Sequence, residues 1–284
     1  ASAVKELVEN SIDAGATKIE IIMRDGGRTF ISVTDNGCGM SKQDLVLAVE
    51  RHATSKLPND NLDSISTLGF RGEALPSIGA VSRLSIKTRS KNMDTGWSIN
   101  VTGGDIEAAT PSSLKMGTKV EIRDLFYATP ARLKFLKTDR TETGRTIEVI
   151  RRIAMVNPNI SFTLSDGNRT NIRFNGVQGN LSNIKLSRIG EVLGRDFEEN
   201  SLLIEAEREG FILTGYAGLP TLNRRTSSHQ FLFVNGRPVQ DKLLYGAVRA
   251  AYSDFLAYDR HPLVVLFLDA PKSTLDVNVH PAKS

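Results

Sequence analysis

The first forty residues constrain this chain most, because they predict an amphipathic helix followed by a hairpin that ends in an acidic turn. At about 100° per residue, the side of the helix expected to be buried consists of Val4, Leu7, Val8, Ser11 and Ile12. Glu6, Asn10 and Asp13 fall on the opposite side, with Glu6 and Asn10 one turn apart. A carboxylate and an amide stacked in this way could hold a water and a metal ion against a phosphate. A solvated polar face has the same pattern.

The hairpin consists of strands predicted at residues 18–23 and 30–34, which are rich in Ile, Val, Thr and Phe and are joined by a turn at residues 25–27. The second strand leads directly into Asp35, Gly37 and Gly39. An aspartate at a strand end can accept a hydrogen bond from an exocyclic amine, and the glycines let the backbone approach a flat ring closely. A common Asp-Asn-Gly turn is the alternative interpretation.

A third feature is the glycine-containing loop at residues 69–75, with the sequence GFRGEAL, which leads into a helix predicted to end near Ile78. Backbone N–H groups at such a helix start can bind an anion. The chain has no Gly-x-x-x-x-Gly-Lys-Ser/Thr pattern, so the loop is not a P-loop. Lys56 lies in a polar loop from which it could reach a phosphate, although a loop lysine is usually only solvated.

Length and composition set the broad class. The 284 residues are more than one core usually holds, so two domains are expected. The most apolar stretch, residues 263–268, is far too short to span a bilayer. A net charge of +4 permits contact with nucleic acid without requiring it. Cys38 is the single cysteine, which excludes an internal disulfide and a cysteine-cluster metal site and, without a signal peptide, suggests the cytoplasm.

Hydrophobic patterning predicts the remaining elements. Further strands of an antiparallel sheet are expected at residues 81–88, 97–101, 119–122, 161–164 and 170–174. Helices are expected after a capping signal at Ser41 and Asp44 and around residues 147–154. Beyond a predicted linker at residues 175–183, the pattern restarts with a helix near 189–193, strands at 202–206, 211–217, 231–234 and 263–268, and a long helix at about 241–256.

The order of these motifs resembles a known superfamily. Glu6 with Asn10, Asp35-x-Gly37-x-Gly39 and residues 69–75 are similar to the successive ATP-site motifs of the GHKL ATPases, which include DNA gyrase, the ninety-kilodalton heat-shock chaperones and the histidine kinases. Within that superfamily the wording resembles the bacterial MutL family of mismatch-repair ATPases. The blocks that carry this resemblance are KELVENSIDAGAT at 5–17, RHATSK at 51–56, DLFY at 124–127, TPAR at 129–132 and DVNVHPAK at 276–283.

The resemblance implies an α+β fold with two domains. Residues 1–180 would form a GHKL (Bergerat) ATP-binding α/β sandwich with a mixed, mostly antiparallel sheet, with the family's N-terminal covering segment missing. Residues 184–284 would form a smaller ribosomal-protein-S-five-like α/β transducer domain. Any endonuclease of the family would lie beyond Ser284.

The same resemblance assigns roles within an ATP site. Glu6 would be the general base, Asn10 would ligate Mg²⁺, and Asp35 would read the adenine amine together with a water that Thr118 helps to hold. Lys283 would reach the γ-phosphate from the second domain and act with the catalytic residues. The other residues expected to contact ATP are Gly37, Gly39, Met40, Thr54, Ser55, Lys56, Leu68, Gly69, Phe70, Arg71, Gly72, Glu73, Ala74 and Leu75.

Basic side chains of the second domain suggest a contact with the DNA backbone that is independent of base sequence. They are Arg224, Arg225, Arg237, Lys242 and Arg249. Lys242 and Arg249 are seven residues apart and therefore share one face of the predicted helix. Scattered charges that only increase solubility are the alternative.

These assignments lead to three hypotheses. In the first, the chain is a DNA mismatch repair ATPase of the bacterial cytoplasm and nucleoid, in which slow hydrolysis of ATP with Mg²⁺ drives closure of a homodimer on DNA. Its partners would be the mismatch-recognition protein MutS and a downstream nuclease or helicase, with no membrane involved. The second is a gyrase-like strand-passage subunit, a chaperone or a histidine-kinase-type enzyme. A histidine kinase would lack the second α/β domain, and a gyrase-like subunit or a chaperone would have to explain why the mismatch-repair sequence blocks recur after residue 120. The third is a nucleotide-gated scaffold, which would not need Glu6.

Overall fold

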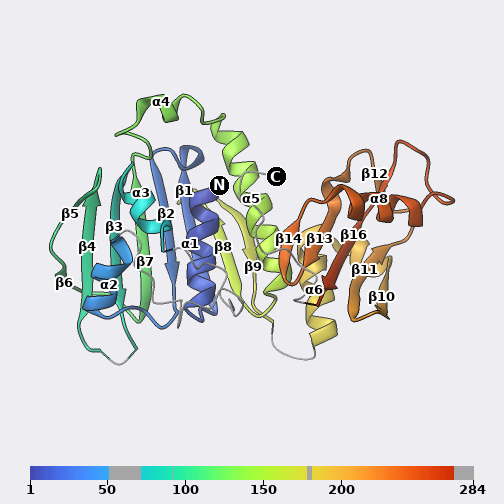
Figure 1. The fold of residues 1–284 in the computed structure, drawn as a ribbon, viewed down its shortest axis with the longest axis horizontal. Helices are drawn as coiled ribbons and strands as arrows, with labels where there is room; N and C mark the ends of the chain where they lie inside the picture. Colours follow the sequence, from blue (N-terminus) through green and yellow to red (C-terminus); the bar gives the residue numbers. More distant parts are fainter. Residues whose placement is uncertain (51–71, 92, 178–180, 272–284) are drawn as a thin grey trace. The chain divides into compact units, whose positions relative to one another are not determined.

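The computed structural model describes residues 1–50, 72–91, 93–177 and 181–271 (Figure 1). By its internal contacts the chain divides into two compact units. Unit 1 consists of Ala1–Arg151 and Asn159–Val177, and unit 2 consists of Arg152–Pro158 and Gln178–Ser284. No helix among the described residues is both long enough and apolar enough to cross a membrane.

Unit 1 is built on one sheet, to which nine strands contribute within the described residues. Their order is β5-β4-β3-β7-β2-β1-β8-β9, and β6 also pairs with β4. The pairings are antiparallel except for β1 with β8, which confirms a mixed, mostly antiparallel sheet. The strands are β1 Lys18–Arg24, β2 Phe30–Asp35, β3 Arg83–Arg89, β4 Gly96–Thr102, β5 Asp105–Ile106, β6 Thr110–Ser112, β7 Gly117–Arg123, β8 Ser161–Ser165 and β9 Thr170–Phe174.

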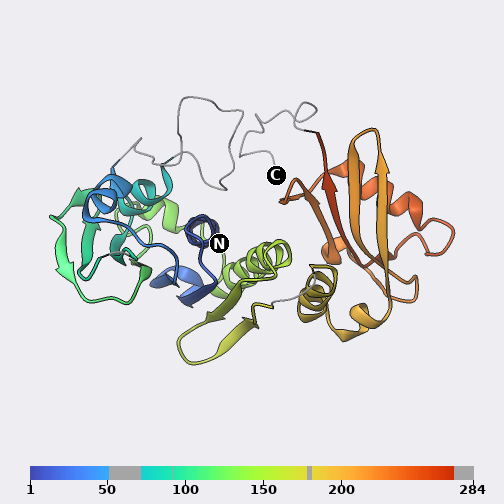
Figure 2. The same ribbon diagram turned by 90° about the horizontal axis from the view of Figure 1, so that it is seen from below.

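Helices cover one face of this sheet, and both ribbon views show α1 beside α5 there (Figures 1 and 2). Successive side chains of a strand point to opposite faces, so the covered face carries every second residue. On β1 and β3 these are Ile19, Ile21, Leu84 and Ile86, each no more than 2% exposed. The helical elements of unit 1 are α1 Ser2–Asp13, η1 Asp25–Gly27, α2 Lys42–Val49, α3 Ala74–Gly79, α4 Pro130–Leu133 and α5 Asp139–Val156.

Local signals in the sequence explain how α1 and α2 form. The side of α1 predicted to be buried is buried at Val4, Leu7, Val8 and Ser11, whereas Ile12 is only half-buried. The predicted cap of α2 is confirmed. The Asp44 N–H donates to Ser41 Oγ at 3.2 Å, and the Ser41 N–H donates to the Asp44 carboxylate at 3.3 Å, which satisfies two donors at the helix start.

Among its described residues, unit 2 contains a five-stranded sheet in the order β10-β11-β16-β13-β14 and a two-stranded sheet of β12 and β15. The Phe233 and Phe267 rings on adjacent strands stack with their centroids 4.9 Å apart, and Lys185 of α6 lies over the Phe267 ring. The opposite face of the sheet packs against Val248 of α8 through Leu232 and neighbouring apolar side chains. The elements are α6 Leu181–Leu193, α7 Arg195–Glu199, β10 Ser201–Arg208, β11 Phe211–Gly218, β12 Asn223–Arg224, η3 Ser227–His229, β13 Gln230–Val234, β14 Arg237–Val239, α8 Lys242–Ala251, β15 His261–Pro262 and β16 Val264–Asp269.

The helix predicted at residues 241–256 is shorter than expected. It begins after Asp241, whose carboxylate accepts the N–H groups of Leu243 and Leu244, but it ends at Ala251. The next residue, Tyr252, donates its hydroxyl hydrogen to the Gly218 carbonyl of the sheet at 2.6 Å. This tertiary hydrogen bond lies where the helix ends, and the local sequence contains no pattern that predicts the bond.

A buried arginine joins α6 to the end of α5 inside unit 2. The Arg188 side chain is fully buried, and its guanidinium donates to the carbonyl oxygens of Ala154 at 3.2 Å and Pro158 at 2.9 Å. It also donates to the Glu191 carboxylate at 3.0 Å. A helix leaves its last carbonyls without partners inside the helix, so Arg188 supplies donors to the chain end of α5.

Replacing Arg188 by methionine should lower the free energy of unfolding of unit 2 by about 2–4 kcal/mol, because buried carbonyl oxygens lose their donors. Urea unfolding followed by a probe in unit 2 measures this. Arg208, whose side chain is 88% exposed, gives the matched control Arg208→Met, with an expected change within about 0.5 kcal/mol. Equal stability of the two variants would contradict the role of Arg188.

Candidate functional site

Three neighbouring strands of unit 1 place a row of polar side chains on the covered face of the sheet. Asp35 at the end of β2 is paired with Thr118 on β7, and Thr118 is paired with Thr88 on β3. Directly paired residues project to the same face. Thr88 is fully buried and Thr118 is 9% exposed. Thr88 and Thr118 therefore lie within the apolar layer between the sheet and its helices, where a polar group needs a partner, and Asp35 at the end of the row is half-buried.

The Asp35 carboxylate is held by donors from three separate segments. Its Oδ1 accepts the N–H of Gly37 at 2.9 Å and the N–H of Thr118 at 3.3 Å. Its Oδ2 lies 2.9 Å from the hydroxyl of Ser11 on α1, which is also 3.0 Å from the Leu7 carbonyl oxygen. Burial raises the pKa of Asp35 above its ordinary value, against the opposing effect of these hydrogen bonds. The carboxylate is thus fixed in position and Oδ2 keeps capacity to accept a hydrogen bond.

Glycine is required at two positions around this carboxylate. Gly39 has a φ of +66°, and a Cβ there would collide with the Arg89 carbonyl oxygen. Gly117 has a φ of +122°, and a Cβ there would collide with the Asp35 carbonyl oxygen. Both positions combine a left-handed backbone with close approach of another strand, which only glycine tolerates.

The turn after β2 is clamped to the loop between α1 and β1. The Asn36 side-chain oxygen accepts the N–H groups of Thr17 at 2.9 Å and Lys18 at 2.8 Å, and its amide donates to the Thr17 hydroxyl. The Cys38 N–H donates to the Ala14 carbonyl at 2.9 Å. The asparagine of the Asp-Asn-Gly sequence is therefore explained by its structural role in holding the turn.

Helix α1 carries the predicted general base, Glu6, and the predicted Mg²⁺ ligand, Asn10. Glu6 and Asn10 are both half-buried and one turn apart, and α1 is tied to β2 through Ser11 and Asp35. Among the described residues, no hydrogen bond or ion pair engages the Glu6 carboxylate. Burial raises the pKa of Glu9 on the same helix, opposed by Lys5 at 3.7 Å.

Of the residues expected to contact a nucleotide, the structure brings together Asp35, Gly37, Gly39, Met40 and Thr118. Ala74 and Leu75 begin α3, Glu73 is its N-cap, and Gly72 precedes it with a φ of +62°. The remaining predicted positions lie outside the described residues: Thr54, Ser55, Lys56, Leu68, Gly69, Phe70, Arg71 and Lys283.

Thr88 is a member of this site that sequence reasoning missed. Its Oγ1 accepts the Met40 N–H at 2.9 Å and lies 3.1 Å from both the Gly117 carbonyl and the Thr118 hydroxyl. A threonine in a strand is ordinary, so the only signal is the sheet order that pairs β3 with β7. Ser11 was placed with the apolar side of α1, where it is indeed buried, but its bond to Asp35 was not foreseen.

The described residues contain no group of three or more His, Cys, Asp and Glu side chains that could hold a metal ion. Mg²⁺ in nucleotide enzymes is commonly bound by one or two protein ligands together with waters and substrate phosphates. The half-buried Asn10 amide beside the Glu6 carboxylate is a donor set that fits this mode.

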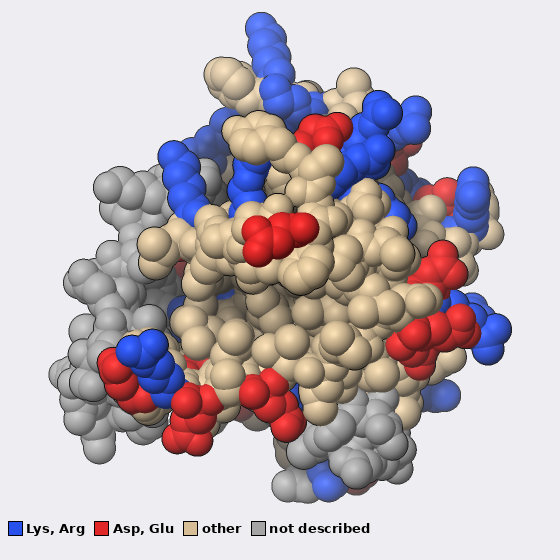
Figure 3. Space-filling view, turned by 90° about the vertical axis from the view of Figure 1, so that its right-hand side faces the viewer, with Lys and Arg blue, Asp and Glu red and all other residues tan. Residues whose placement is uncertain are grey.

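The predicted DNA contacts of unit 2 are exposed on the surface. Arg224, Arg225, Arg237 and Lys242 are exposed, and Lys242 begins α8. Arg249 is also exposed, but its guanidinium lies 3.9 Å from the centroid of the Tyr258 ring and donates to the Tyr258 carbonyl at 3.1 Å. In Figure 3, Lys and Arg side chains gather in the upper part of the face, and acidic side chains lie mainly below.

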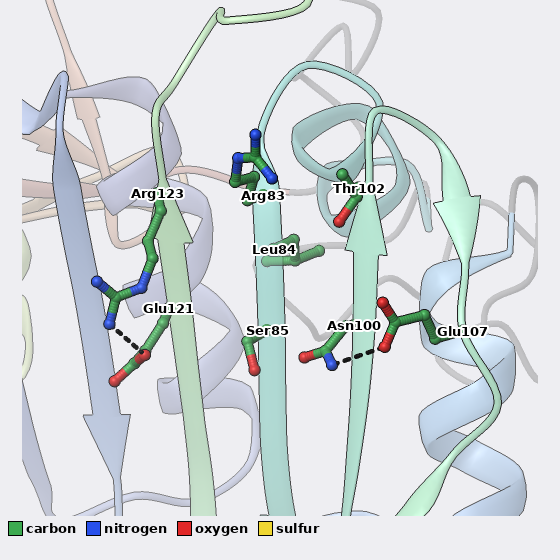
Figure 4. Close-up of a pocket in the computed structure, with 8 residues that line it drawn as sticks. All are labelled: Arg83, Leu84, Ser85, Asn100, Thr102, Glu107, Glu121 and Arg123. Atoms are coloured by element: carbon green, nitrogen blue, oxygen red, sulfur yellow. Dashed lines mark hydrogen bonds and ion pairs between the residues drawn. The ribbon is translucent and has the colours of Figure 1, made fainter.

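A hollow of about 250 Å³ lies on the opposite face of the unit 1 sheet (Figure 4). It is lined by Arg83, Leu84, Ser85, Asn100, Thr102, Glu107, Glu121 and Arg123. Glu121 is three residues from Thr118 on β7, and an odd offset along a strand changes the face. Arg123 pairs with Glu121 at 3.3 Å, and Asn100 donates to Glu107 at 2.8 Å. The hollow is separate from the Asp35 row, and its Arg83 pairs with Asp124 outside the lining at 3.4 Å.

Comparison with known proteins identifies the family. Residues 1–122 match the family described as histidine kinase-, DNA gyrase B- and HSP90-like ATPase, and residues 189–284 match the DNA mismatch repair protein C-terminal domain. A solved structure titled Aquifex aeolicus MutL ATPase domain complexed with ADP is 31% identical, has a TM-score of 0.73, and covers 95% of this chain and 91% of its own. The chain belongs to the MutL family of DNA mismatch repair proteins.

Other MutL relatives agree. The MutL of Rhodospirillum rubrum is 59% identical and that of the Brucella abortus strain S19 is 54% identical, both over the whole of this chain. The chain covers 45% of the length of each, so it spans less than half of these relatives. A structure titled N terminal domain of a DNA repair protein, 31% identical with a TM-score of 0.79, covers 98% of this chain and 85% of its own.

The MutL comparisons confirm the predicted fold class. The ATPase family match spans α1 to Ile122, one residue before the end of β7, and so includes Glu6, Asn10, Asp35 and Thr118. The mismatch-repair match covers the larger part of unit 2. The chain therefore combines a GHKL ATPase domain with a second domain of the ribosomal-protein-S-five-like type.

The raised pKa of Asp35 predicts a pH dependence of stability. Between its ordinary value of 3.8 and its raised value in the folded chain, the folded state binds more protons at Asp35 than the unfolded state. Stability contributed by this group is therefore lost as pH rises through that window. Relative to Asp35→Asn, which cannot titrate, the wild type should lose unfolding free energy as pH rises from 3.8 and then reach a plateau.

Unfolding free energies of the wild type and Asp35→Asn across an acid pH series measure this difference directly, because all other titrating groups are shared. A difference that does not change with pH would contradict the burial argument.

Proposed function

We propose that the Asp35 row and α1 form the ATP site of a mismatch-repair ATPase that binds and slowly hydrolyses ATP with Mg²⁺. The observation that carries this proposal is the half-buried Asp35 carboxylate, held by Ser11 of α1 and by the N–H groups of Gly37 and Thr118. The Asp35 carboxylate is a fixed acceptor that suits an adenine amine. Glu6 and Asn10, on the helix that Ser11 ties to Asp35, suit a phosphate with its metal ion and water. Membership of the MutL family supports it.

Recognition of the base would depend on Asp35. Its Oδ2 accepts a hydrogen from the exocyclic amine, while Thr118 contributes an oxygen beside it, directly or through a water. The backbone of Gly37 and Gly39 carries no side chain that would obstruct the ring. Met40 follows in the same turn, and its N–H donates to the Thr88 hydroxyl.

Phosphate binding and hydrolysis would depend on α1 and the loops beyond it. Mg²⁺ bound with the phosphates would neutralise their charge, and the Asn10 amide oxygen would be its protein ligand. Glu6 would orient the attacking water and accept its proton. Residues 69–75, Lys56 and Lys283 would add N–H and ammonium donors to the β- and γ-phosphates.

The output of this chemistry would be a conformational change rather than a fast product flux. A contact between Lys283 and the γ-phosphate distinguishes triphosphate from diphosphate and couples the second domain to the site. Closure of a homodimer on ATP, with a grip on the DNA backbone, would link mismatch recognition by MutS to a downstream nuclease or helicase. A bacterial cytoplasmic location at the nucleoid follows from that role.

Glu6→Ala should reduce ATP turnover by about 10²–10⁴-fold, because the general base is lost, while ATP affinity stays within about threefold. Single-turnover hydrolysis and equilibrium binding on the full-length protein separate the two quantities. Glu20→Ala, an exposed glutamate on β1, is the matched control. Turnover that survives in Glu6→Ala would show that Glu6 is not the base.

Reversing charge at Arg225 and Lys242 should weaken DNA binding to the full-length protein equally for all sequences. Each lost phosphate contact should reduce the slope of log affinity against log salt by about 0.9 for duplex DNA. The double variant Arg195→Glu with Arg208→Glu, at exposed positions of the same unit, makes the same change in net charge and is the control. The Arg225 and Lys242 double variant should hydrolyse ATP at the wild-type rate in the absence of DNA. An unchanged salt slope in that variant would place the DNA contact elsewhere.

A further inference from the structure

Thr88 lies at the centre of a hydrogen-bond network whose direction can be determined. Its hydroxyl oxygen has three neighbours: the Met40 N–H at 2.9 Å, the Gly117 carbonyl oxygen at 3.1 Å and the Thr118 hydroxyl at 3.1 Å. The residue is fully buried, so water does not compete for these contacts. A threonine hydroxyl has one hydrogen to donate and two lone pairs with which to accept.

Only one assignment of hydrogens satisfies all three contacts. The Met40 N–H can only donate, so it takes one lone pair of Thr88. The Gly117 carbonyl can only accept, so it takes the single hydrogen of Thr88. The contact with Thr118 then needs a hydrogen from Thr118 itself, because hydroxyl orientation follows from the network of partners. The Thr118 hydroxyl hydrogen therefore points toward Thr88.

This direction decides what Thr118 offers on its other side. With its hydrogen used on Thr88, Thr118 Oγ1 has only lone pairs for a ligand. Its neighbour in the row, Asp35, likewise offers carboxylate oxygens. A water bridging the two would give its hydrogens to them and would present a lone pair in turn. Thr118 and Asp35 thus both offer acceptors to a ligand, whether the contact is direct or through one water.

We propose that Thr88 is a specificity-determining positioning residue, which fixes Thr118 as an acceptor and so restricts the site to a purine nucleotide with an amine at C6. The inference rests on the proposed binding of ATP at Asp35. An amine supplies hydrogens to such acceptors, whereas the C6 carbonyl of hypoxanthine or guanine would place a lone pair against them. A site built for a donor rejects the analogue that lacks it, because its buried polar groups are left unpaired.

A purely structural role for Thr88 leads to a different result. Loss of its hydroxyl leaves the Met40 N–H without that acceptor, and a loosened turn would weaken binding of every nucleotide to the same degree. The ratio of two affinities separates the explanations. ITP is the suitable probe, because it replaces the amine of ATP by a carbonyl and keeps the ribose and triphosphate.

The experiment measures equilibrium binding of ATP and ITP to the full-length protein and to variants at Thr88. In Thr88→Val the Thr118 hydroxyl is free to rotate and donate, so the preference for ATP over ITP should fall by about tenfold, the equivalent of roughly 1.4 kcal/mol. Thr88→Ser keeps the hydroxyl and should keep the preference. Thr146→Val removes another fully buried threonine hydroxyl, on α5, and should also leave the ratio unchanged.

Parallel weakening of ATP and ITP in Thr88→Val, with their ratio constant, would overturn the proposal and leave Thr88 as an anchor for Met40. If Thr88→Val does not fold, Thr118→Val removes the proposed acceptor and must also lower the ratio. A wild-type protein that binds ITP as tightly as ATP would contradict the inference and recognition of the amine by Asp35, while nucleotide binding at the site would stand. A wild-type protein that binds neither nucleotide would instead overturn the proposed function.

Discussion

The arrangement of unit 1 depends on one half-buried carboxylate. Asp35 receives hydrogen bonds from Ser11 of α1, from Gly37 in the turn after β2 and from Thr118 of β7. Burial of a carboxylate is unfavourable unless such donors are present, and the raised pKa of Asp35 shows that desolvation still outweighs them. The donors come from separate parts of the chain. Because all of them bond to the same carboxylate, they fix the helix, the turn and the strand relative to each other.

The geometry of the proposed chemistry follows from that constraint. The hydrogen bond between Ser11 and Asp35 holds α1 against the sheet. Asn10 is adjacent to Ser11 and Glu6 is one turn before Asn10, so the same bond positions both side chains relative to the sheet. On the sheet, the row continues from Asp35 through Thr118 to Thr88, which determines the direction of the hydroxyl hydrogens. The end that binds the base and the end that binds phosphate are thereby placed by the same few contacts.

Much of the fold could be predicted because local patterns and tertiary structure agree. Both strands of the first hairpin and the cap at Ser41 were found from alternation and capping residues. The end of α8 at Ala251 could not be, because it coincides with a bond from Tyr252 to a distant carbonyl. The role of Thr88 could not be predicted for the same reason. It depends on the pairing of β3 with β7, and a threonine in a strand gives no local indication of that pairing. The roles proposed for Glu6 and Asn10 stay predictions from family resemblance.

The most direct test of the central claim is a crystal structure of the full-length protein with Mg²⁺ and an ATP analogue that is not hydrolysed. The account predicts the adenine amine within hydrogen-bond distance of the Asp35 carboxylate, the Asn10 amide oxygen on Mg²⁺, and a water between Glu6 and the γ-phosphate. Adenine bound away from Asp35, or Mg²⁺ held without Asn10, would contradict it.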